Sequence, residues 1–271
     1  MKWEIRVSYK AQNLGHSPKA EMLVLLFLSW AGLSTAASLA PHALVPRLRA
    51  AANTTVGEGA VQQRLVCYDS TGQYGEAHTY TDYAPYLPYM DNRIESCCFN
   101  GIWILYGQQN YNGANSQEHN FWAYGTDYCT DMQPQFMNQA SSLRYSGHPQ
   151  DMYRDSINLY FMEYFMGDEE FAYQDAPFLN YDNRAQSIIV TGSQWWTVYD
   201  GAYYGGYSAC LAPGNNGFPA FYPTAGSLHN LANSISSVRM GCYSSTRLLP
   251  SDPPARALGN NATVAGHSAF H

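Results

Sequence analysis

The sequence predicts an all-β protein with two domains, each built from two copies of one motif. Three observations predict this fold class: two fragments that each occur four times, a repeat spacing that alternates between short and long, and a composition rich in tyrosine and glycine. Repetition in register is a stronger signal than any single motif, because chance does not repeat itself at a fixed spacing.

The first fragment places a glycine seven residues after a tyrosine. The four tyrosine–glycine pairs are Tyr68 and Gly75, Tyr106 and Gly113, Tyr160 and Gly167, and Tyr199 and Gly206. An aromatic residue stands two positions before the glycine at Tyr111, Phe165 and Tyr204, whereas the first copy has Gln73 there. We expect each glycine to adopt φ > 0, which only glycine accepts at low cost. Each tyrosine is expected to cover its folded hairpin.

The second fragment follows each copy of the first and ends in a serine. The four copies read DNRIES from Asp91, MNQASS from Met137, DNRAQS from Asp182 and ANSISS from Ala232. The final serines are Ser96, Ser142, Ser187 and Ser237. A serine hydroxyl bonds readily to nearby backbone groups, so we expect these serines to tie each turn to its hairpin.

The spacing of the copies indicates that a unit of two motifs was duplicated. Copies one and three begin 92 residues apart (Tyr68 to Tyr160), and copies two and four 93 residues apart (Tyr106 to Tyr199). We therefore expect a first domain over residues 63–147, a linker over 148–156 and a second domain over 157–243. Apolar residues within the repeats alternate with period two, which is typical of strands.

Composition and charge restrict the class of partner. Charged residues make up 13% of the 271 residues, and the net charge is −7. No basic surface is available to bind nucleic acid, so we expect no nucleic-acid partner. The 23 tyrosines and 22 glycines suit short strands with tight turns and aromatic cross-strand pairs.

The first 40 residues resemble a secretory signal, with a basic flank, a short apolar run from Met22 and small residues at its end. Met22 is an alternative start, and a signal anchor is an alternative to cleavage, although the run is short for a membrane span. We expect no stable span after signal removal and an extracellular location. Residues 41–62 are expected to form a flexible leader or propeptide, and residues 244–271 a flexible tail. Asn53 and Asn261 lie in glycosylation triplets within these ends.

The repeated residues resemble the βγ-crystallin superfamily. Its Greek-key motifs carry an aromatic–x4–aromatic–x–Gly hairpin and, further on, a serine-containing turn into the last strand. The resemblance covers about residues 63–243, and the first copy is its weakest member. It implies two Greek-key β-sandwich domains of βγ-crystallin type, each with two motifs and two antiparallel sheets.

Six cysteines in a secreted chain are expected to form disulfides, with fifteen connectivities open. Cys67 lies on the first strand of its motif and Cys97 begins the last strand, and these strands are neighbours in the implied architecture. A Cys67–Cys97 bridge is therefore the favoured pair, with Cys98 as the rival partner. The other cysteines, Cys129, Cys210 and Cys242, remain unassigned.

The second fragment also resembles the family's calcium motif, (Asn/Asp)-(Asn/Asp)-x-x-(Ser/Thr)-Ser. In the family, one motif supplies the side chain at position one and its partner motif supplies the hydroxyl at position five. This exchange implies one site from Asp91 and Ser141 and another from Asp182 and Ser236. Backbone carbonyls such as that of Arg93 would complete a shell of oxygen ligands. The simpler alternative is that the fragment is only a turn whose Asp and Asn bond their own backbone.

The reciprocal position in each domain lacks the required ligands. Met137 and Ala232 replace the ligand at position one, while Glu95 and Gln186 replace the hydroxyl at position five. The resemblance therefore implies calcium as a partner at one competent site per domain.

No catalytic motif is present, since the sequence lacks H-E-x-x-H, G-x-S-x-G and a phosphate-binding glycine loop. We expect a structural or protective secreted protein that is not an enzyme. The alternative is an extracellular binding module, acting as a toxin, an inhibitor or a glycan-binding protein with the same fold and without calcium. The protein or glycan partner is not identified by the sequence.

Overall fold

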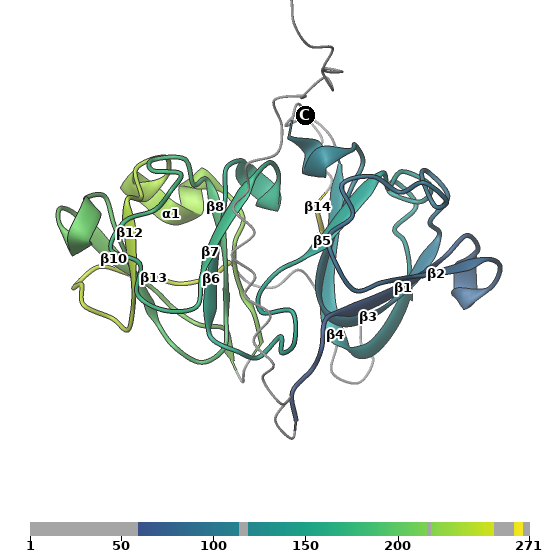
Figure 1. Ribbon diagram of the computed structural model, residues 1–271, viewed down its shortest axis with the longest axis horizontal. Helices are drawn as coiled ribbons and strands as arrows, with labels where there is room; N and C mark the ends of the chain where they lie inside the picture. The colour runs from purple at the N-terminus through teal and green to yellow at the C-terminus, as the bar shows by residue number, and fades with distance from the viewer. Residues whose placement is uncertain (1–58, 114–118, 216–217, 252–262, 268–271) are drawn as a thin grey trace, which may run out of the picture. The chain divides into compact units, whose positions relative to one another are not determined.

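The structure is a computed structural model that describes residues 59–113, 119–215, 218–251 and 263–267 (Figure 1). All of these lie within one compact unit of the chain, residues 53–271. The expected signal segment and the glycosylation triplets Asn53 and Asn261 fall outside the described residues, as does nearly all of the expected leader. No helix among the described residues is long and apolar enough to cross a membrane.

The first domain consists of short strands joined by tight turns. Its elements are β1 (Arg64–Tyr68), η1 (Thr71–Gln73), β2 (Ala77–Tyr80), β3 (Ser96–Tyr106), η2 (Asn110–Asn112), β4 (Asn120–Asp131) and β5 (Ser142–Tyr145). The second domain repeats this order. Its elements are β6 (Ser156–Tyr160), η3 (Glu163–Phe165), β7 (Glu169–Ala172), β8 (Ser187–Thr191), β9 (Trp196–Tyr199), η4 (Ala202–Tyr204), β10 (Ser208–Leu211), β11 (Ala220–Tyr222), α1 (Ala225–Leu228), η6 (His229–Leu231) and β12 (Ser237–Met240).

Two long strands of the first domain each serve both motifs. The first part of β3 lies between β1 and the end of β4, and its second part lies between the start of β4 and β5. The register shifts between Phe99 and Gly101, where Gly101 has a φ of 101°. A Cβ on Gly101 would lie 1.9 Å from Oε1 of Gln63, the atom that accepts the N–H of Ile102. Only glycine allows this close approach at the bend.

The second domain divides the same pattern between two sheets. One sheet has the order β11-β8-β6-β7, and the other contains β12, β9 and β10. In both domains the third strand of one motif joins the sheet of the other motif, because bridges pair Ala84 with Leu143 and Ala176 with Val238. This exchange between motifs is the Greek-key topology, so the predicted fold class is confirmed. The domain limits drawn from the repeats remain a prediction.

Each domain has its own hydrophobic core. Trp103 is fully buried in the first core, together with the Cys67–Cys97 disulfide, and Trp196 is fully buried in the second. A third cluster combines residues of both domains, among them Trp122 and Phe165, whose rings meet edge to face at 5.1 Å. The linker therefore joins domains that share buried apolar surface.

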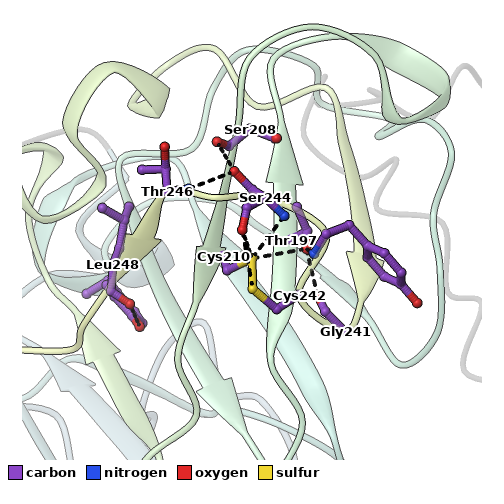
Figure 2. The surroundings of a disulfide bond; sticks show 10 residues. Thr197, Ser208, Cys210, Gly241, Cys242, Ser244, Thr246 and Leu248 are labelled. Atoms are coloured by element: carbon purple, nitrogen blue, oxygen red, sulfur yellow. Dashed lines mark hydrogen bonds between the residues drawn. A yellow bond between two sulfur atoms is a disulfide. The ribbon is translucent and has the colours of Figure 1, made fainter.

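Three disulfides use all six cysteines. Cys67 is joined to Cys97 between β1 and β3, and Cys98 to Cys129 between β3 and β4. The neighbours Cys97 and Cys98 thus connect β3 to a different strand on each side. The third disulfide, Cys210–Cys242, connects β10 to the chain just after β12 (Figure 2).

Two strands lie within residues 244–271, the segment expected to be a flexible tail. β13 (Arg247–Leu248) pairs in parallel with β10, and β14 (Thr263–His267) pairs antiparallel with β4. Both segments are strands because their backbones pair with strands of the two domains. Short strands of this kind carry too little periodicity for sequence to identify.

Arg144 is buried where the two domains meet. Its Nε lies 2.9 Å from the hydroxyl of Tyr106 and 3.5 Å from a carboxylate oxygen of Glu169, and its Nη2 donates to the carbonyl of Phe165 at 2.9 Å. The guanidinium also lies 4.6 Å from the ring centroid of Tyr111. Burial alone would lower the pKa of Arg144, but its surroundings raise that pKa above the ordinary value, so the side chain stays charged. Arg144 and Glu169 thus form a charged link between domains that is almost fully removed from water.

Replacing Arg144 with methionine should destabilise the protein by about 3 kcal/mol, because it leaves the Glu169 carboxylate buried without its cation. The measurement is urea unfolding of wild type and variant. The matched control is Arg93→Met, which removes an arginine whose ion pairs with Asp69 and Glu76 lie at the surface. We expect a much smaller change for this control, because water screens exposed pairs. Equal losses in the two variants would contradict the assigned role of Arg144.

Candidate calcium-binding loops

All four hairpins are folded back by consecutive residues in the left-handed region. In three hairpins these are followed by the predicted glycine at φ > 0, namely Gly75 (85°), Gly167 (74°) and Gly206 (77°). The tyrosine that begins the hairpin packs on the later aromatic residue in three copies, with ring centroids 5.5–5.7 Å apart. These pairs are Tyr106 with Tyr111, Tyr160 with Phe165 and Tyr199 with Tyr204.

The prediction for Gly113 is wrong. Its φ is −64°, and the left-handed conformation moves one residue earlier to Asn112, with a φ of 58°. Asn112 is fully buried, where its Oδ1 accepts the N–H of Gln108 and its Nδ2 donates to the carbonyl of His119. An asparagine tolerates this conformation when its amide bonds the backbone locally, so the turn closes without the glycine.

The final serine of each loop ties its hairpin as predicted. Every one of these hydroxyls donates to a hairpin carbonyl at 2.6–2.7 Å and accepts a hairpin N–H at 2.9–3.0 Å. The carbonyl and N–H partners are Ser70 and Gln73 for Ser96, Gln108 and Tyr111 for Ser142, Met162 and Phe165 for Ser187, and Gly201 and Tyr204 for Ser237. The same bond pair in all four motifs fixes the loop that precedes each serine.

The two loops of each domain face one another through reciprocal backbone bonds. In the first domain, Asn92 N–H donates to the carbonyl of Ala140 and Asn138 N–H to that of Ile94, both at 2.9 Å. In the second domain, Asn183 N–H donates to Ile235 at 3.1 Å and Asn233 N–H to Ala185 at 2.8 Å. The four asparagines have φ of 53–60°. Position two of each loop is thus bound to position four of its partner.

This pairing brings the predicted ligands of the first domain onto facing loops. Asp91 precedes the donor Asn92 and is exposed, while Ser141 follows the acceptor Ala140 and is 6% exposed. Position one of one loop and position five of the other are therefore neighbours of the same hydrogen bond. The arrangement can offer a carboxylate and a hydroxyl to one cation, beside backbone carbonyls such as that of Arg93.

The second domain repeats the arrangement with Asp182 and Ser236. The Ser236 hydroxyl donates to the carbonyl of Asp200 at 3.0 Å, and its oxygen also lies 3.4 Å from Oδ1 of Asn183. Because the proton is used toward Asp200, the lone pairs of this oxygen are directed elsewhere. Asp182 is exposed and accepts a bond from Asn183 Nδ2 at 3.1 Å. These donors fit a hard cation.

The reciprocal positions are used for packing. Met137 packs against the first core and Ala232 against the second, so neither presents an oxygen at position one. Glu95, which replaces a hydroxyl, accepts a bond from Asn138 Nδ2 at 2.9 Å. Position one therefore differs between the two loops of each pair: Asp91 and Asp182 are exposed, whereas Met137 and Ala232 pack against the cores.

The sequence did not predict which residues contact the arginine at position three of two of the loops. The Arg93 side chain bridges Asp69 at 2.7 Å and Glu76 at 3.0 Å on the first hairpin. The pKa of Asp69 is lowered, chiefly by the N–H of Glu76 and also by Arg93. Arg184, its counterpart, stacks on Phe161 at 4.5 Å. In the sequence, the only signal was an arginine at the same position of both loops.

No group of three or more His, Cys, Asp and Glu side chains lies together in the part of the chain that the structure describes. A calcium ion held by these loops would depend on hydroxyl and carbonyl oxygens beside a single carboxylate. Extracellular calcium modules with few charged ligands bind in the range of roughly 10⁻⁴–10⁻³ M.

Comparison with solved structures supports the fold. Geodin, a βγ-crystallin from Geodia cydonium, matches with a TM-score of 0.52 and 19% identity, over 66% of this chain and 99% of that one. An archaeal βγ-crystallin is 31% identical over 32% of this chain and 96% of its own, with a TM-score of 0.28. Protein S complexed with calcium is 16% identical over 66% of this chain and 100% of its own, with a TM-score of 0.26. We draw no conclusion from the two matches with TM-scores below 0.5.

The chain therefore shares the βγ-crystallin fold with Geodin, and its four repeated motifs agree with that fold. A second comparison shows that residues 141–211 are similar to the model of peptidase inhibitor family I36. That segment contains the whole third motif and the first two strands of the fourth. Curated protein sequences give no significant match.

Substitutions at Asn92 should test the geometry of the paired loops. Asn92→Ala should destabilise the protein by about 1 kcal/mol, because alanine in the left-handed region carries a Cβ penalty that asparagine partly avoids. Asn92→Gly should change the stability very little, because glycine adopts this conformation freely. Urea unfolding of both variants makes the comparison. If alanine proved as well tolerated as glycine, the loop would not hold this conformation in solution.

Proposed function

We propose that this protein is a secreted, non-catalytic βγ-crystallin with a structural or protective role that binds calcium at one site in each domain. Asp91 and Ser141 would hold the ion in the first domain, and Asp182 and Ser236 in the second. The observation that carries the proposal is the reciprocal hydrogen bonding of the two loops, which sets a carboxylate position beside a hydroxyl position in each domain.

Calcium would connect two loops that come from different motifs. Its contribution is charge: a divalent cation balances the exposed carboxylate and accepts oxygen ligands from both loops at once. The chain's own residues provide the rest, since the serine bonds and the left-handed asparagines orient the loops before any ion arrives. An ion that binds only the folded state stabilises it in proportion to the logarithm of its concentration.

An extracellular location agrees with the cysteine chemistry. All six cysteines are paired, and such bonds persist in oxidising compartments and are rare in the cytosol. The apolar run after Met22 supports the same proposal, since it resembles a signal segment.

Removing one carboxylate should remove about half of the calcium stabilisation. With free calcium at about 100 times the dissociation constant, each site should add about 2.7 kcal/mol to the stability. We expect Asp91→Asn and Asp182→Asn each to lose one such contribution, and the double variant to lose both. The measurement is thermal unfolding with calcium and with chelator.

The matched control is Asp127→Asn, an exposed carboxylate of the first domain that lies outside both loops and has a φ of 52°. It should retain the full calcium effect. Equal calcium stabilisation of the wild type and the double variant would refute the proposed sites, and the loops would then be only turns.

A second candidate function is peptidase inhibition, which the similarity of residues 141–211 to peptidase inhibitor family I36 favours. Three disulfides and two packed cores make this protein rigid. Rigidity suits an inhibitor, because a rigid protein loses little conformational freedom when it binds. Among the binding-module alternatives, inhibition is therefore the one that an observation supports.

Inhibition should be measured against one serine, one cysteine, one aspartic and one metallopeptidase. We expect near-stoichiometric inhibition of at least one class by the disulfide-bonded protein and loss of inhibition after reduction and unfolding. The control is the reduced, alkylated chain at the same concentration. Degradation of the native protein by all four enzymes, without inhibition, would overturn this second function.

A further inference from the structure

In the first domain, the arginine at position three of the loop holds the backbone that precedes position one. Nη1 of Arg93 donates to the carbonyl of Tyr89 at 2.9 Å, two residues before the proposed ligand Asp91. Nη2 of Arg93 donates to Oδ2 of Asp69 at 2.7 Å and to Oε2 of Glu76 at 3.0 Å, both on the first hairpin. One guanidinium therefore ties the residues on both sides of Asp91 to that hairpin.

In the second domain, a carboxylate holds the corresponding backbone. Oε1 of Glu170, on β7, accepts the N–H of Asn180 at 2.8 Å and its Nδ2 at 2.9 Å, and Oε2 accepts the N–H of Tyr181 at 3.0 Å. Asn180 stands two residues before the proposed ligand Asp182, the place that Tyr89 has in the first domain. The same part of the loop is thus held by a cation in one domain and by an anion in the other.

The equivalent residues of the two domains make different contacts. The pairing of β1 with β2 and of β6 with β7 puts His78 where the second domain has Glu170, and the His78 ring lies 6.1 Å from that of Tyr89. Arg184, at position three of its loop, stacks on Phe161 at 4.5 Å. The repeats therefore do not encode a shared anchor, and each domain fixes the same backbone with a different charged group.

A fixed loop matters for a cation that takes oxygens from two loops. The reciprocal backbone bonds of Asn92 and Asn183 hold each loop on the side that follows position one. Arg93 and Glu170 hold the side that precedes it. A loop that is ordered before the ion arrives loses little conformational freedom on binding, which raises the affinity.

We infer that Arg93 and Glu170 are positioning residues for the two proposed calcium sites, each acting through the backbone before the carboxylate at position one. The inference rests on the proposed calcium function and adds what tunes its sites. Charge alone leads to a different expectation, because a nearby cation repels calcium and a nearby carboxylate attracts it. Loss of Arg93 would then strengthen the first site and loss of Glu170 would weaken the second, whereas positioning requires that both losses weaken binding.

The test is a calcium titration of the disulfide-bonded protein, followed by the amide NMR signals of Asn92 and Asn183, which report the two sites separately. Arg93→Met should weaken the first site about fivefold, the factor that corresponds to ordering one more backbone residue on binding. Glu170→Gln should weaken the second site by a similar factor. Each variant should leave the other domain's site unchanged.

Two control variants change the same charges away from the anchors. Arg64→Met removes an exposed arginine at the start of β1, and Asp168→Asn removes an exposed carboxylate of the second domain. Neither should change a dissociation constant by more than about twofold, because water and salt screen exposed charges.

A second measurement reads the loops without calcium. In the presence of chelator, Arg93→Met should accelerate hydrogen exchange of the Asn92 amide, and Glu170→Gln that of the Asn183 amide, because a loosened loop opens more often. A change of charge that leaves the loops ordered would not accelerate this exchange.

Stronger calcium binding by Arg93→Met, or exchange rates equal to those of the wild type, would overturn the inference and leave the calcium sites in place. Calcium shifts that persist unchanged in Asp91→Asn and Asp182→Asn, or a wild type that shows no shifts, would overturn the proposed sites and the inference with them.

Discussion

The structure depends on one interaction that recurs four times, the bond pair of a buried serine hydroxyl with its hairpin. Each hairpin contains residues such as Tyr164 and Phe165 in the left-handed region, where a non-glycine residue costs about 1–2 kcal/mol. Such a conformation persists only where surrounding contacts determine it. The serine meets this need because it donates to one hairpin carbonyl and accepts one hairpin N–H. Since the same serine begins the last strand of its motif, it fixes the hairpin, the preceding loop and the strand order together.

The serine interaction explains why sequence predicts so much of this fold. A tyrosine, a glycine and a serine at fixed spacing are local requirements, and three of the four hairpins follow them. Gly113 departs because the buried amide of Asn112 supplies the closure that glycine gives elsewhere. Arg144 could not be predicted in the same way. In the sequence it stands in an alternating strand, where a charged residue indicates a solvent face, and only the packing of Glu169 and three tyrosines around it shows that it is buried.

For the candidate calcium loops, too, the sequence predicts some features and not others. The resemblance to the family's calcium motif predicts their candidate ligand residues, and the reciprocal backbone bonds bring position one of each loop near position five of its partner. The contacts that surround these loops could not be predicted from the sequence. Arg93 reaches Asp69 on a hairpin 24 residues earlier, and Ser236 bonds the carbonyl of Asp200, 36 residues earlier. Such contacts depend on how the hairpin lies against the loop, which no local pattern encodes. They matter nonetheless, since they determine which oxygens remain free to meet a cation.

The two proposed functions require the same physical property, a binding surface that is ordered before its partner arrives. In the loops, order comes from left-handed asparagines and reciprocal backbone bonds, so a cation would find its ligands already close. For the inhibitory function, order would come from the three disulfides, among them Cys210–Cys242, and from the two packed cores. Because the entropy of these segments is lost during folding, little more is lost on binding.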